Sequence, residues 1–320
     1  MDILNPYYMQ IAMFFLIHAI LGISIYITLS SGQMTLGNAG FMSVGAYVSA
    51  LLTLKMDLPI VVGVIVGGIC AALVAVIIGL PTTRLQGLYL AIATLGFGEV
   101  VRVVFLNLEI TNGALGLSGI PSMEQGISIF LYQNGFDEIG GLGAETIGNL
   151  AVIFILFLIL CLITLFCVRI NNSRVGRAFA AIKADQHAAE LMGIDTVYYK
   201  MLAFVIGAFV AGIGGALYAH ITFFINPTDF NYHKVVDMLL FTVFGGSNVV
   251  WGPILGSFIL TLLPEVLRFM ADYRDMLYGA LLVVLMIVRP DGILTEELCA
   301  KWEAKFSGKK TAVESADQSK

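Results

Sequence analysis

Long apolar segments separated by short polar stretches run through most of the chain. They cover residues 9–30, 34–54, 59–80, 86–107, 150–168, 201–224, 235–264 and 276–288. Most approach or exceed the roughly 20 residues that a helix needs to cross a hydrocarbon core about 30 Å thick. The pattern therefore predicts an all-α polytopic membrane protein with roughly eight to ten transmembrane helices, some of them broken or re-entrant.

Two of these segments are interrupted by polar and glycine residues. Segment 34–54 begins with such a stretch, and segment 235–264 is too long for one span and is broken in its middle. Paired interruptions in the two halves of a transporter indicate a central pathway, although two unrelated glycine clusters that serve packing alone would look the same. The candidate pathway residues are Asn38, Gly40, Thr94, Gly245, Gly246 and Asn248.

The charges of the polar loops predict how the chain is oriented. The loop 169–200 has more Lys and Arg than Asp and Glu, whereas the acidic loop 108–149 has no Lys or Arg. Because basic loops are retained in the cytoplasm, we expect 169–200 inside and 108–149 outside. The N-terminus then lies outside if segment 34–54 crosses once, and inside if that segment is re-entrant; the sequence leaves both open.

Composition supports a membrane environment. The 320 residues are 58% hydrophobic and 12% charged, more apolar side chain than one soluble core can hide. The net charge of −5 argues against a nucleic-acid partner. The four cysteines form no Cys-x-x-Cys pair, so no metal site is predicted.

We expect one transmembrane domain over residues 1–300 and a polar, disordered tail over 301–320.

Few ionisable residues lie within the apolar segments. Glu99 and Arg102 are three apart on a predicted helix and should form an ion pair. We expect the pair close to the membrane interface, which favours a structural role over a functional one. His18 is interpreted as a hydrogen-bonded core residue in preference to a proton relay.

The sequence has no recognisable catalytic machinery. There is no G-x-x-x-x-G-K-[ST] phosphate loop, no Gly-x-Ser-x-Gly elbow and no His-Glu-x-x-His helix. We therefore expect a protein that is not an enzyme, and an ATP-driven mechanism would need its ATPase on another chain.

The loop 169–200 itself should contain two short helices. Residues 174–184 are Ala-rich, Asp185 can cap a second helix, and Gly193 can end it in a left-handed conformation. A stripe of Phe179, Ile182 and Ala189, with Gln186 between them, would suit a groove on another protein. A solvated connector is the alternative.

Several motifs then resemble one known family. His187-Ala188-Ala189 followed by Gly193 resembles the Glu-Ala-Ala loop of ABC-importer permeases. The wider run 173–220 resembles the branched-chain amino acid permease family. The length of the chain and its loop 111–121 are most similar to the M-type subunit of that family. Further matches are Ser31-Gly32-Gln33, Gly37-Asn38-Ala39-Gly40-Phe41, residues 84–98, Thr111-Asn112-Gly113 and Phe244-Gly245-Gly246 with Gly252-Pro253.

The resemblance implies an ABC-importer permease for Leu, Ile and Val in the bacterial inner membrane. It implies a homologous H-type permease partner, two cytoplasmic ATPases that bind ATP and Mg²⁺, and an external or periplasmic binding protein, with no cofactor on this chain. His187 stands where the general motif has Glu. The expected coupling residues are Phe179, Ile182, Asp185, His187, Ala188, Ala189, Glu190 and Gly193.

Other functions remain open at this stage. Related permeases of the same family take up urea or short amides. A secondary transporter would require a buried carboxylate or histidine relay, for which Glu99 and His18 are the only candidates. A purely structural membrane protein is disfavoured by the polar breaks at membrane depth.

Overall fold

The computed structural model describes residues 5–133, 138–139, 142–266, 279, 283 and 292–294. Its α-helices are α1 Pro6–Ser30, α2 Asn38–Lys55, α3 Ile60–Thr82, α4 Leu88–Asn107, α5 Met123–Gln133, α6 Ala144–Asn171, α7 Arg174–Ala184, α8 Gln186–Leu191, α9 Thr196–Thr222, α10 Tyr232–Gly245 and α11 Gly252–Val266. The 3-10 helices are η1 Glu109–Thr111, η2 Gly113–Leu115 and η3 Pro227–Phe230, and the strands are β1 Leu117–Ser118, β2 Glu138–Ile139, β3 Leu142–Gly143 and β4 Phe224–Ile225.

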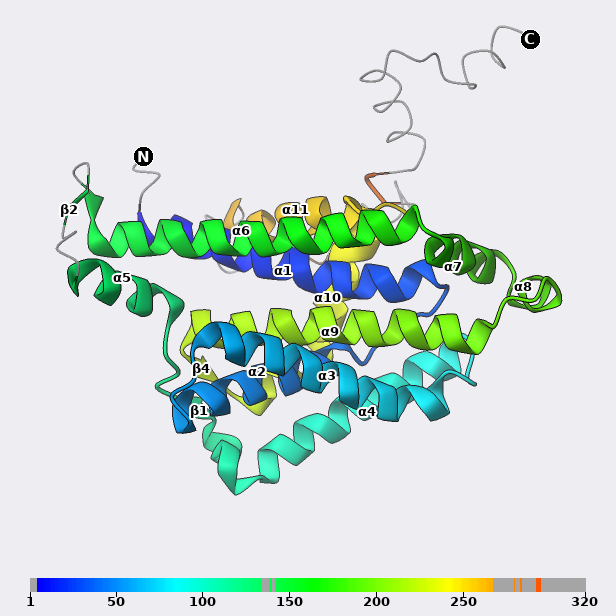
Figure 1. Cartoon of the computed structure of the whole chain (residues 1–320), viewed down its shortest axis with the longest axis horizontal. Coiled ribbons are helices and arrows are strands. Elements are labelled where there is room, and N and C mark those ends of the chain that lie inside the picture. Colours follow the sequence, from blue (N-terminus) through cyan, green and yellow to red (C-terminus); the bar gives the residue numbers. More distant parts are fainter. Residues whose placement is uncertain are drawn as a thin grey trace, which may run out of the picture.

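Helix α9 lies in the middle of the bundle, in contact with α1, α2 and α3 (Figure 1). Small residues allow these contacts. A Cβ atom on Gly45 of α2 would overlap the carbonyl oxygen of Gly212 in α9, and one on Gly215 would overlap that of Met42. Close backbone approach of this kind replaces hydrophobic burial as the main attraction between helices in lipid. Segment 201–224, which forms most of α9, thus packs tightly inside the bundle.

Five helices among the described residues are long and apolar enough to span a membrane: α1, α3, α4, α9 and most of α6. Helices α2, α10 and α11 are shorter or more polar because two non-helical segments interrupt the apolar runs. These segments, residues 31–37 and 246–251, are called the first and second chain breaks. The all-α polytopic class is confirmed. The span expected at 276–288 and the tail at 301–320 lie almost entirely outside the described residues, so the total of eight to ten spans stays a prediction.

The first break follows α1. The chain turns at Ser31 and Gly32 and then runs back along α1 without helical structure until Asn38. The Thr35 hydroxyl lies 3.2 Å from that of Thr28, and the Asn38 amide donates to the Ser24 hydroxyl at 3.0 Å. Helix α2 therefore begins about 9 Å inside the end of α1, at 1.5 Å per residue.

From this point α2 continues to the end of the bundle where α9 finishes. The Ser49 hydroxyl lies 2.9 Å from a ring nitrogen of His220, near the last turn of α9. Segment 34–54 therefore ends at the end of the bundle opposite to the one where it starts, which favours a single crossing over the re-entrant alternative. Helix α5 lies at the end of the bundle opposite to α7 and α8 (Figure 1).

The second break separates α10 from α11, as predicted. Strand β4 pairs with β1, η3 follows, and α10 begins only at Tyr232. After Gly245 the chain turns, and α11 returns along α1, where the Thr261 hydroxyl lies 3.1 Å from Nδ1 of His18. The interpretation of His18 as a hydrogen-bonded core residue is confirmed.

The α2–α9 contact can be tested by adding one methyl group. Replacing Gly45 with Ala should lower the free energy of unfolding by about 3 kcal/mol, because α2 must move away from the Gly212 backbone. The melting midpoint of the purified protein in detergent measures this change. Gly126→Ala in α5 is the control, since no heavy atom lies within 4 Å of the added Cβ. Equal midpoints for the two variants would contradict the contact.

Candidate functional site

The α7–α8 hairpin is built by four local capping devices. The Ser173 hydroxyl accepts from the amide of Val175 at the start of α7. The Asp185 carboxylate accepts from the amides of His187 and Ala188 at 2.8 and 3.1 Å, so it caps α8 as predicted.

The far end of α8 also agrees with the prediction. Gly193 has a φ of +82°, and its amide donates to the Glu190 carbonyl at 3.0 Å. The amide of Ile194 reaches back to the Ala189 carbonyl at 3.1 Å, which completes a Schellman motif. Asp195 then caps α9 by accepting from the amide of Tyr198. The hairpin therefore has a defined shape and is not a loose connector.

The predicted docking stripe is turned inward. Phe179, Ile182 and Ala189 are buried within their own chain, and the Phe179 ring packs edge-on against Tyr199 of α9 at 6.4 Å between centroids. The expectation that this stripe lies in a groove of another protein is wrong for these three side chains. The apolar face of helix α7 packs against α9 and α1. A helical projection shows that this face is apolar, but not whether it packs within the chain or against a partner.

The outer surface of the hairpin carries different residues. Leu191 and Met192 are 89% and 83% exposed, and His187, Ala188, Glu190 and Gly193 are exposed beside them. Hydrogen bonds from the Gln186 amide and the Thr196 hydroxyl hold the pKa of the Glu190 carboxyl below its ordinary value. Leu191 and Met192 are not among the predicted coupling residues, although two large apolar side chains just before a helix-ending glycine are a usable signal.

On the side of the hairpin that faces the helix bundle, α7 touches both chain breaks. The ammonium group of Lys183 donates to the Asn248 side-chain oxygen at 2.7 Å, in the break between α10 and α11. A Cβ atom on Gly32, in the first break, would lie 3.1 Å from the Lys183 Cα. The positive φ of Gly32, +75°, lets the chain turn there.

The six candidate pathway residues therefore separate into two groups. Asn38, Gly40 and Thr94 lie together at mid-depth, where the Thr94 hydroxyl accepts from the Leu36 amide at 3.0 Å. Gly245, Gly246 and Asn248 belong to the break that α7 contacts, and the turn at Gly246 has a φ of +126°. The role of all six residues in a substrate pathway stays a prediction.

A small cavity at mid-depth joins the starts of two helices. Leu36 and Ala39 contribute from the start of α2, Asn231 and Tyr232 from the start of α10, and Glu99 from α4. The N-terminal end of a helix carries a partial positive charge. Two such ends and one carboxylate therefore border the same space.

The predicted ion pair on α4 is present. The Arg102 Nε atom lies 2.7 Å from a Glu99 carboxylate oxygen. Glu99 lies near the middle of α4, next to Gly98, which is adjacent to Gly40 in the first turn of α2. The expected position of the pair near the membrane interface stays a prediction.

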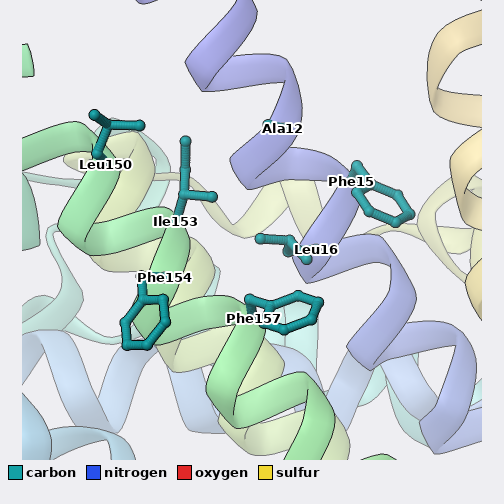
Figure 2. A pocket seen from close by; sticks show the side chains of 7 residues that line it. All are labelled: Ala12, Phe15, Leu16, Leu150, Ile153, Phe154 and Phe157. Carbon is teal, nitrogen blue, oxygen red and sulfur yellow. The ribbon is translucent and has the colours of Figure 1, made fainter.

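A larger groove of about 430 Å³ lies between α1 and α6 (Figure 2). Its lining is entirely apolar, with Phe15, Leu16, Ile153, Phe154 and Phe157 among the residues. An apolar groove on the outer face of a membrane protein suits lipid chains better than a zwitterion, since it has no polar partner to offer. Among the described residues no cluster of three or more metal-ligating side chains occurs.

Comparison with known proteins identifies the family. Residues 7–286 match the model of the branched-chain amino acid transport system permease component. The chain belongs to this permease family.

Individual relatives agree with this assignment. The chain is 33% identical over 294 residues to the high-affinity branched-chain amino acid transport system permease protein LivM of Escherichia coli, which covers 89% of this chain and 69% of the relative. It is 36% identical over 149 residues to LivH of the same organism, covering 45% and 46%. A probable LivM of Methanocaldococcus jannaschii is 24% identical over 258 residues, covering 74% and 69%. No solved structure matches the chain at a significant level.

The cap of α8 in this permease can be tested directly. Asp185→Ala should destabilise α8 by about 1 kcal/mol, because the amides of His187 and Ala188 lose their acceptor. Hydrogen exchange of the α8 amides should become faster. Asp185→Asn keeps an acceptor oxygen and should preserve the parent exchange rate. Unchanged exchange in the alanine variant would contradict the capping role.

Proposed function

We propose that this permease is a subunit of an ATP-driven importer that takes up leucine, isoleucine and valine. Its energy comes from two cytoplasmic ATPases on other chains, its substrate from an external binding protein, and its membrane partner is a homologous H-type permease. The family match over residues 7–286 supports this function. The α7–α8 hairpin contacts both chain breaks, which supports a mechanism in which ATPases on other chains supply the energy.

The hairpin offers a continuous route for coupling. Exposed Leu191 and Met192 provide apolar anchors for an ATPase outside the bilayer. Movement of α7 would act on Asn248 through Lys183 and on the turn at Gly32 through close backbone packing. Both chain breaks would thus change together, which suits a switch between outward and inward states.

The mid-depth cavity, of about 10 Å³, is too small for leucine in this state, but its lining residues suit a zwitterion with an aliphatic side chain. The starts of α2 and α10 favour a carboxylate, Glu99 favours an ammonium group, and Leu36 and Val235 are apolar neighbours. We infer that this cavity becomes wider during transport and that the substrate pathway runs next to it.

Uptake into proteoliposomes tests the proposal. Vesicles holding this chain, the H-type permease and both ATPases should import labelled leucine only with ATP and the binding protein. Urea and acetamide are the competing substrates within the family, and faster uptake of either would replace the amino-acid assignment. Proton-driven leucine uptake without any ATPase, abolished by Glu99→Gln, would support a secondary transporter instead.

Changing the outer surface of the hairpin should uncouple transport. Met192→Glu places a charge where an apolar contact is expected, so ATP-dependent leucine uptake should fall by at least tenfold, equivalent to about 1.4 kcal/mol of lost docking energy. The matched variant Met192→Leu keeps the contact and should transport normally. An unchanged melting midpoint separates lost docking from misfolding, and normal uptake by the glutamate variant would contradict the docking role.

The link from α7 to the second break gives a separate prediction. Asn248→Leu removes the acceptor of the Lys183 ammonium, so less leucine should be imported for each ATP hydrolysed. Asn248→Asp retains an acceptor oxygen and should keep the parent ratio. Uptake and hydrolysis are measured in the same vesicles. An equal ratio in all three proteins would show that this contact does not transmit the motion.

A further inference from the structure

One exposed stripe of the bundle is unlike the rest of its membrane-facing surface. On α4, Ile92, Gly96, Glu99 and Val103 recur at helical spacing and face outward; we name them the α4 stripe. Glu99 is 38% exposed and its partner Arg102, at the edge of the stripe, is 26% exposed. The pair is thus neither buried in the chain nor placed at the end of its helix.

The depth of this pair makes lipid a poor neighbour. Gly98 packs beside Gly40, in the first turn of α2, which begins well inside the bundle. Glu99 therefore lies roughly 12 Å, and Arg102 roughly 7.5 Å, from the end of α4 at Asn107, at 1.5 Å per residue. Removing an ion from water into a low-dielectric medium costs several kcal/mol even after relaxation, and charged residues at membrane depth face protein or a wet cavity.

Two other outer faces supply the comparison. The exposed side chains along α3, such as Ile69, Leu73 and Ile77, are all apolar, and so are Phe154 and Leu162 on α6. Neither helix has a charged residue in its central turns. These faces suit lipid without any further partner, so the α4 stripe differs from them in its chemistry and not merely in its exposure.

Gly96 adds an independent feature. It is exposed, and a Cβ atom placed on it would meet no heavy atom within 4 Å. A glycine in the middle of an outer helix face has no packing role within its own chain, whereas small residues at such positions let a second helix approach closely. It lies one turn from Glu99, on the same stripe.

We propose that the α4 stripe is the contact surface for the homologous H-type permease, which covers the Glu99–Arg102 pair in the assembled transporter. The inference rests on the proposed function for the identity of the partner. Both LivM and LivH of one bacterium are similar to this chain and carry the same transport-system description. Tyr232 and the mid-depth cavity adjoin Glu99, so the contact also brings the cavity to the boundary between the two subunits.

Single cysteines in the complete complex test this surface. Cys70, Cys161, Cys167 and Cys299 are first replaced by Ala, and one cysteine is then introduced by Val103→Cys on the α4 stripe. Ile77→Cys on α3 is the matched control, because both native side chains are apolar, exposed and in long outer helices. A nitroxide label at each position reports collisions with oxygen dissolved in the bilayer.

Assembly with the H-type permease should lower the oxygen accessibility at position 103 and leave that at position 77 unchanged. A short bifunctional cross-linker should join position 103, but not 77, to cysteines introduced along the H-type permease. Equal accessibility at the two positions in the complex would overturn the proposal, and cross-links only between two copies of this chain would overturn the choice of partner. Leucine uptake is measured on the same complex, so lost import with intact cross-links counts against the proposed function and not against the surface.

Discussion

Backbone polar groups at membrane depth must find partners inside the protein, and this constraint governs the rest of the structure. Residues 31–37 and 246–251 are not helical, so their amides and carbonyls lack the regular bonds of a helix. Thr94 accepts the Leu36 amide, and the Gln33 side chain donates to the Lys200 carbonyl at 2.8 Å. Each break is therefore held against neighbouring helices and cannot be an isolated flexible loop.

Tight glycine packing supports the same arrangement. At Gly45 and Gly215 the backbones of α2 and α9 approach too closely for any side chain, and at Gly212 a Cβ atom would meet Ala71 and Gly68 of α3. Near the second break, Gly245 and Gly252 pack backbone against backbone in the same way. These contacts fix the positions of α2, α10 and α11. The mid-depth cavity and the packing of α7 against the two breaks therefore both depend on them.

The coupling hairpin connects this interior to the protein's surroundings. Capping by Asp185 and the Schellman turn at Gly193 give it a fixed shape, and its apolar face is used for seating on α9. What remains for a partner is the exposed pair Leu191 and Met192, together with the neighbouring polar residues. In the proposed mechanism, transport depends on how a rigid hairpin moves the two breaks that it contacts.

Local patterns in the sequence correctly predict the helical membrane class, the two breaks, the bounds of α7, the cap at Asp185, the stop at Gly193 and the Glu99–Arg102 pair. All of these follow from local rules, namely hydrophobic length, helix propensity, capping and spacing along one helix. The three-dimensional fold is needed to show that Phe179 and Ile182 face inward, that Asn248 contacts α7, and that Glu99 lies near the start of α2. These depend on which segments meet across more than a hundred residues of chain, and a one-dimensional pattern of polar and apolar positions does not contain that information.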